Sequence, residues 1–84
     1  MTVQFKNVAL TNHCLARARQ RIDLGCDVNS LEYQYKLEGL MRKAVLRDMN
    51  NKGYVFEFVY NQKTYQIFGN IKDNTLIAST IYPK

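Results

Sequence analysis

The sequence is short of several residue types on which common structural and chemical sites depend. Its 84 residues include no tryptophan, one proline, one histidine, two cysteines and four glycines. Cys14 and Cys26 lack Cys-x-x-Cys spacing, and together with a single histidine they supply too few ligands for a zinc site. We therefore expect two reduced thiols, with Cys14 in the core, and neither a metal nor any other cofactor.

Long apolar runs are also missing. No stretch approaches the roughly 18 residues of a membrane span, and residues 1–10 lack the basic-then-apolar layout of a signal peptide. These absences favour a cytoplasmic protein with no membrane partner. A chain of this length buries roughly 60–65% of its unfolded surface, which allows one modest core. The hydrophobic content of 46%, with six tyrosines and four phenylalanines, is sufficient for it, so we expect a single domain over residues 1–84.

Charge of one sign predominates. Twelve lysines and arginines against seven acidic residues give a net charge of +5. Such an excess suits a polyanionic partner, which could be RNA, DNA, an acidic protein or an acidic surface. Charge alone does not choose among them.

The first third of the chain predicts a strand followed by a helix. Residues 2–10 alternate between apolar and polar side chains, which indicates a strand at a sheet edge. Thr11 or Asn12 is a suitable N-cap for a helix that ends near Ile22. Gly25 then closes a turn.

A second helix and three strands are predicted from the rest. Asn29 and Glu32 resemble a capping box, and the helical spacing of apolar residues after them continues to about Asn50, with Gly39 inside the helix. From residue 54 the period changes to two, which predicts strands at 54–60, 64–71 and 75–82. The expected fold is α+β in the order β-α-α-β-β-β, with two helices packed on one face of a three- to four-stranded antiparallel sheet.

The helix expected at residues 12–22 carries the residues best suited to chemistry. His13, Arg17 and Arg21 are spaced four apart and therefore share one helix face, with Arg19 to the side. A neutral imidazole can accept a proton from a ribose 2′-hydroxyl while guanidinium groups bind the phosphate, so no metal is required. We predict His13 and Arg17 as catalytic residues and Arg21 and Arg19 as RNA-binding residues. The alternative is a solvated helix face.

The last strands offer further contacts for RNA. Lys63, Tyr82 and Lys84 are candidates for holding a phosphate or stacking on a base. Most other tyrosines fit core or cross-strand packing better. Glu57 interrupts an apolar strand, and it is either on an exposed face or paired with a basic side chain.

The helix motif resembles the opening of small domains in the RelE-like fold group, above all RegB-like phage endoribonucleases and related toxin-like domains. The matching residues are Thr11, His13, Leu15, Arg17 and Arg21, with Ala18 and Gln20 between them. The resemblance implies a metal-independent endoribonuclease of a bacterial host's cytoplasm, which acts as a toxin or a phage host-takeover protein. Its substrate would be single-stranded or ribosome-associated messenger RNA, with an antitoxin or a host protein as a further partner. RegB-like enzymes use a second histidine, which this chain lacks, whereas RelE-type members cleave with Lys, Arg and Tyr.

Two other functions remain open. A non-catalytic basic protein of a phage or mobile element could bind and inhibit a host enzyme or RNA, and it would present a flat aromatic and basic patch instead of a cleft. The second of these is a DNA-binding regulator that uses one helix, but the predicted three-stranded meander disfavours it. An endoribonuclease instead requires His13, Arg17 and an aromatic or basic residue of the last strands to converge in one concavity.

Overall fold

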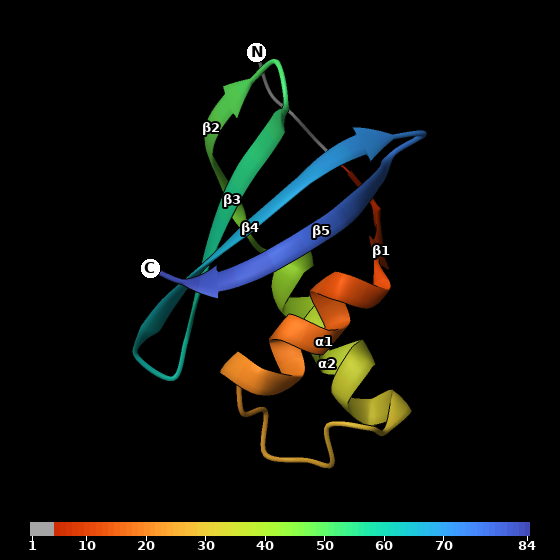
Figure 1. Ribbon diagram of the computed structural model, residues 1–84, viewed down its shortest axis with the longest axis vertical. Helices are drawn as coiled ribbons and strands as arrows, with labels where there is room; N and C mark the ends of the chain where they lie inside the picture. Colours follow the sequence, from red (N-terminus) through yellow and green to blue (C-terminus); the bar gives the residue numbers. More distant parts are fainter. Residues whose placement is uncertain (1–4) are drawn as a thin grey trace.

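The computed structural model describes residues 5–84, which form two helices and one five-stranded sheet (Figure 1). The α+β class and the two helices are confirmed. Residues 2–4 of the first predicted strand lie outside the described residues. In chain order the elements are β1 (Asn7–Leu10), α1 (Asn12–Arg21), α2 (Leu31–Arg42), β2 (Val45–Asn50), β3 (Gly53–Tyr60), β4 (Lys63–Lys72) and β5 (Thr75–Pro83).

The sheet is mixed, and its strands follow the order β1-β5-β4-β3-β2. β5, β4, β3 and β2 are antiparallel neighbours, whereas β1 pairs with β5 in parallel. The expected edge position of the first strand is confirmed. The expectation of a purely antiparallel sheet of three to four strands was wrong, both in strand number and in the direction of β1. Parallel pairing is possible because the two helices and three strands between β1 and β5 provide the long crossover that it requires.

The extra strand replaces the end of the predicted second helix. α2 stops at Arg42, and β2 begins at Val45 and pairs with β3. The apolar run from Ala44 to Leu46 fits either period, so spacing within the segment could not distinguish helix from strand. Pairing with β3 makes this segment a strand. Asn50 ends β2, and its side-chain oxygen accepts the backbone N–H of Lys52 in the turn of the hairpin.

The N-caps of the helices are hydroxyl side chains. Thr11 caps α1 as expected, and its Oγ1 accepts the N–H of Cys14 at 3.1 Å. For α2 the cap is Ser30 and not Asn29, because Ser30 Oγ accepts the N–H of Tyr33 at 3.1 Å. The predicted N-cap at Asn29 was therefore wrong by one residue, and the third helical position holds Tyr33 instead of the glutamate that a capping box requires. Either oxygen satisfies a backbone donor that a helix leaves unpaired in its first turn.

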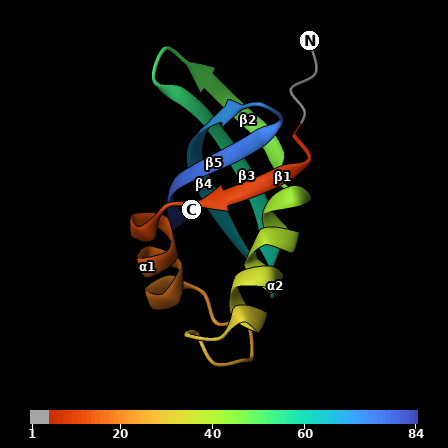
Figure 2. The same cartoon turned by 90° about the vertical axis from the view of Figure 1, so that its right-hand side faces the viewer.

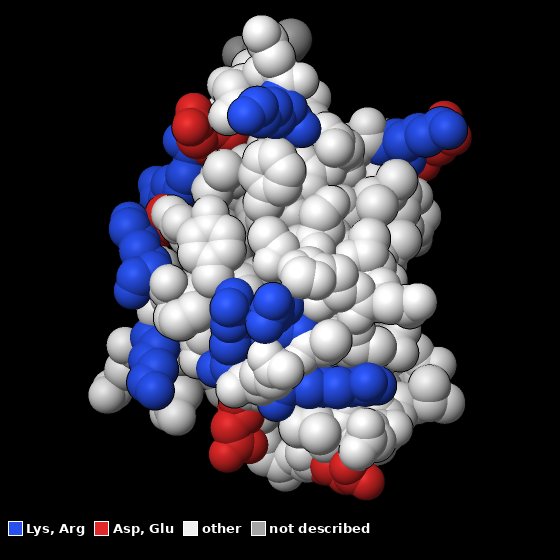
Figure 3. Space-filling view, in the orientation of Figure 1, with Lys and Arg blue, Asp and Glu red and all other residues white. Residues whose placement is uncertain are grey.

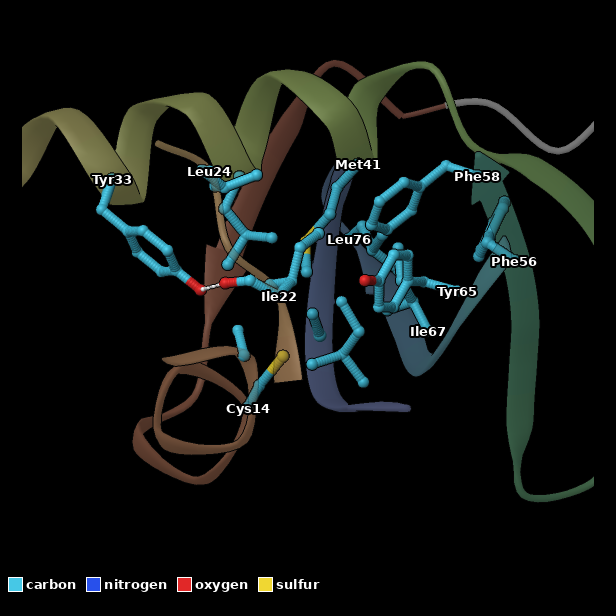
Figure 4. Close-up of a cluster of buried hydrophobic side chains, with 14 residues drawn as sticks. Cys14, Ile22, Leu24, Tyr33, Met41, Phe56, Phe58, Tyr65, Ile67 and Leu76 are labelled. Atoms are coloured by element: carbon cyan, nitrogen blue, oxygen red, sulfur yellow. Dashed lines mark hydrogen bonds between the residues drawn. The ribbon is translucent and has the colours of Figure 1, made fainter. Parts of the chain in front are cut away.

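Both helices pack against one face of the sheet and enclose the core (Figure 2). Cys14 lies in this core, as expected, and the hydroxyl of Tyr33 donates a hydrogen bond to the carbonyl of Ile22 at 2.9 Å (Figure 4). No helix within residues 5–84 is long and apolar enough to cross a membrane. The fully enclosed large side chains are Tyr33, Phe56, Leu37, Met41, Ile67, Leu76, Ile81 and Cys14.

Candidate nucleic-acid interface

α1 lies along the part of the β5 edge that β1 leaves free. β1 pairs only with the beginning of β5, and beyond that point the edge carbonyls are bound by α1 and its cap. Thr11 donates from its backbone to Ala78 at 3.1 Å and from its hydroxyl to Ser79 at 3.2 Å. Arg21 Nη1 donates to the carbonyl of Ile81 at 2.7 Å. These bonds protect the edge from other strands and fix α1 against β5.

The basic residues of α1 divide between two sides of the helix. His13, Arg17 and Arg21 lie in one row, at positions four apart within the helix. His13 is exposed, and Arg17 Nη1 reaches only Gln20 Oε1, at 3.4 Å. Arg19 instead points to the connection between the helices, where its Nε donates to the carbonyl of Val28 at 3.0 Å.

Two of the three arginines therefore have structural partners. Arg19 holds the loop before α2, and Arg21 holds β5, although a guanidinium has five N–H donors and Arg21 uses one of them here. Arg17 has the guanidinium that is least engaged with the protein backbone. Arg17 is therefore the arginine of α1 whose guanidinium has no backbone partner among the described residues.

The sheet face away from the helices carries two aromatic rings. Phe56, Ile67 and Ile81 are cross-strand partners on the buried face, so residues one position away point outward. Tyr82 is one of these, opposite Gln66, and Phe68 is another, opposite Thr80. Both rings are partly exposed.

The period of two predicted over residues 64–71 places Phe68 on the face opposite Tyr65 and Ile67, and the burial of those two residues agrees with this. Phe68 lies next to Tyr82 only because of the register between β4 and β5. That register joins residues distant in sequence, and no local signal gives it. Sequence reasoning therefore missed Phe68 as a functional candidate.

Glu57 lies on the same outward face and is enclosed by cations and an amide. Its Oε2 accepts hydrogen bonds from Gln66 Nε2 at 3.0 Å and from Lys84 Nζ at 3.1 Å, and its Oε1 lies 3.5 Å from Arg47 Nε. The hydrogen bonds from Gln66 and Lys84, and then the charges of Lys84 and Arg47, hold the pKa of Glu57 below its usual range. The carboxylate is therefore ionised at neutral pH and fixes both cations on the sheet face.

Both open alternatives for Glu57 are thus met together, because it is on the outward face and it is paired with basic side chains. Two cations share one carboxylate, so the cluster keeps a net positive charge. Arg47 was missed as a candidate because its segment was predicted to be helical.

Lys63 and Lys84 border a separate hollow at the end of the sheet. The backbone N–H of Lys84 donates to Thr64 at 2.9 Å and holds the end of the chain beside β4. Gln62 and Pro83 complete the wall of this hollow, which has a volume of about 490 Å³. His13 and Arg17 are not part of its wall, so the residues predicted as catalytic and these lysines do not share that concavity.

Charge on this side of the molecule surrounds an uncharged centre. Figure 3 shows basic side chains over α1 and along the side that holds the C-terminus, with an uncharged surface over β4 and β5 between them. Tyr82 lies beside both groups of basic side chains. Arg21 binds the backbone of Ile81, the residue before Tyr82, and Lys84 follows Tyr82 by two residues. This arrangement suits a ligand that is both anionic and aromatic.

The described part of the chain, residues 5–84, contains no group of three or more His, Cys, Asp or Glu side chains that could hold a metal ion. No protein-family description, curated protein or solved structure matches this chain at a significant level. The chemistry of the interface is therefore inferred from its own residues.

Proposed function

We propose that this protein binds single-stranded RNA across α1 and the outward face of its sheet. The observation that supports this most strongly is the pair of rings on β4 and β5 with cations from separate elements on both sides. We call this surface the RNA face, and it consists of Arg17, Arg21, Arg47, Phe68, Tyr82 and Lys84.

The two rings are spaced for neighbouring bases of an extended strand. Phe68 is opposite Thr80, so Tyr82 is its diagonal neighbour on β5. Diagonal neighbours across an antiparallel pair are about 7–8 Å apart. Sheet aromatics at such separations stack successive unpaired bases in other RNA-binding folds, and flanking cations contact the phosphates. A duplex, whose bases are already stacked, could not use the rings in this way.

Metal-independent cleavage of the bound RNA is the second candidate. It is favoured by the exposed imidazole of His13 on the helix side that carries Arg17, next to the RNA face. His13 would take the proton of a ribose 2′-hydroxyl, and Arg17 would stabilise the charge that develops on the phosphate. The resemblance of this motif to RegB-like endoribonucleases, whose histidine at this position is functional, supports the role of His13. Lys84 and Tyr82 of the RNA face would hold the strand.

Replacing Tyr82 with alanine is expected to weaken binding of a fluorescein-labelled single-stranded RNA roughly tenfold or more, because stacking on one ring is worth about 1–3 kcal/mol. Fluorescence anisotropy at fixed salt measures the affinity. Tyr35→Ala is the matched control, since Tyr35 is 63% exposed on α2, away from the RNA face. Equal losses in the two variants would rule out a specific role for the sheet face.

For cleavage, His13→Ala is expected to slow metal-free cutting of a labelled messenger RNA by about a hundredfold or more while leaving its affinity nearly unchanged. The assay is run in EDTA, with Asn12→Ala, at an exposed position of the same helix, as the control. Intact binding without cleavage by the wild-type protein would reject the enzymatic proposal and leave the RNA-binding one. Absence of both would favour an inhibitor of a host protein.

A further inference from the structure

A second concave surface lies on the other side of β3, between α2 and the end of that strand. Two hollows meet there, with volumes of about 330 Å³ and 290 Å³, and they share Leu40 and Lys43 in their walls. Of the residues in the RNA face, only Arg47 lines either of them. We call this surface the edge groove and define it by Lys36, Gly39, Leu40, Lys43, Val59 and Tyr60.

Gly39 lies in the groove wall, although its packing inside the protein does not require a glycine. It occupies the interior of α2, where glycine is less favourable than alanine or any straight-chain residue. A Cβ atom built on Gly39 would meet nothing within 4 Å, so no neighbour in the protein requires its absence. The space that a side chain would fill is the hollow itself.

The groove also contains an open strand edge. β2 begins opposite Glu57, so residues 58–60 of β3 pair with β4 on one side and, within residues 5–84, with no strand on the other. Val59 in this segment is 66% exposed. An unpaired edge is a template for an added strand, which gains main-chain hydrogen bonds from it.

The charges at the rim are positive apart from that of Glu57, which lines one hollow and is already paired with Arg47 and Lys84. Lys43 has no acidic side chain within ion-pair distance in the described residues, and Lys36 shares an exposed contact of 3.6 Å with Glu32 of its own helix. Leu40 and Tyr60 form the apolar part of the wall. An apolar floor, an open edge and a cationic rim together define the complementary ligand.

We propose that the edge groove binds an extended, acidic segment of a partner protein. The segment adds a strand beside residues 58–60 of β3, places one apolar side chain over Gly39, and directs its carboxylates toward Lys36 and Lys43. This surface overlaps the RNA face only at Arg47, which lines one of the two hollows.

The test is selection of random peptides from a display library on the immobilised full-length protein. We expect enriched peptides to share an apolar anchor flanked by acidic residues. Their affinity, measured by calorimetry, should fall at least tenfold for Gly39→Gln, which fills the hollow, and for Lys43→Glu, which reverses the rim charge. Lys72→Glu, an exposed lysine at the end of β4, should leave it unchanged.

Amide chemical shifts of the wild-type protein locate the bound peptide, and changes are expected at Gly39, Leu40 and residues 58–60. Failure to enrich any peptide, a consensus that lacks acidic residues, or equal binding by Gly39→Gln and the wild type would overturn the proposal. RNA affinity of Gly39→Gln serves as the check on folding and should be unchanged. Because that readout uses the RNA face, its loss would show misfolding of this variant, and Lys43→Glu would then decide.

Discussion

Replacing Gly69 with alanine is expected to lower the free energy of unfolding by about 3 kcal/mol, toward the upper end for overpacking. Gly69 lies at a register shift between β4 and β5. A Cβ atom there would overlap the carbonyl oxygen of Ile77 and lie 3.2 Å from Cα of Ala78. These neighbours are backbone atoms of a paired strand, so neither can rotate away. Accommodating the methyl group requires the two central strands to separate.

Gly39→Ala, the same substitution in α2, is expected to have the opposite effect on the free energy of unfolding. Its added methyl group meets open space in a helix, so the free energy of unfolding should rise by about 1 kcal/mol. Urea denaturation measures both changes, and each kcal/mol should shift the melting temperature of a domain of this size by about 4–8 °C. A Gly69→Ala protein as stable as the wild type would show that β4 and β5 do not approach so closely at the bulge.

The second large effect expected is unfolding in alkali. Burial raises the pKa of the Cys14 thiol from 9.0 to about 11 and that of the Tyr33 phenol from 10.0 to about 12. Both groups are neutral when protonated, and the folded state binds these protons more tightly than the unfolded state. Their stabilising contribution is therefore complete below pH 9 and is lost as the pH rises toward 12.

Each shift of about two pKa units corresponds to about 2–3 kcal/mol, so the two together amount to about 5 kcal/mol. A domain of this size is stable by only about 4–13 kcal/mol. Urea titrations at intervals between neutral pH and pH 12 should show this loss, with a midpoint of alkaline unfolding above pH 9.

Cys14→Ala and Tyr33→Phe separate the two contributions. Each variant should be less stable than the wild type at neutral pH. Tyr33→Phe leaves the carbonyl of Ile22 without its hydrogen bond, at a cost of about 1–3 kcal/mol. The slope of stability against pH should nevertheless be flatter than in the wild type. An unchanged slope in the double variant would mean that other groups cause the alkaline transition.

Much of the local structure could be predicted from the sequence, because it depends on neighbours a few residues apart. Thr11 was identified as a cap, the burial of Cys14 followed from the apolar side of the first helix, and the outward position of Phe68 followed from the period of two. The row of His13, Arg17 and Arg21 likewise needs only helical spacing. These local patterns therefore predicted the part of the candidate interface that lies on α1.

The sheet half of the interface was decided by pairing between distant segments. Residues 45–50 fit a helix by their own spacing, and only the partnership with β3 made them a strand and brought Arg47 to Glu57. The register of β4 and β5 set Phe68 beside Tyr82.

The sequence alone thus determined the α+β class, the first helix with its basic row, and the excess of positive charge, since these depend on composition and on short-range spacing. The tertiary structure alone decided the parallel pairing of β1, the attachment of Arg21 to β5 and of Arg19 to the loop, and the ring pair on the sheet. Each of these joins residues whose separation along the chain leaves no trace in local periodicity. They form only when the whole core closes.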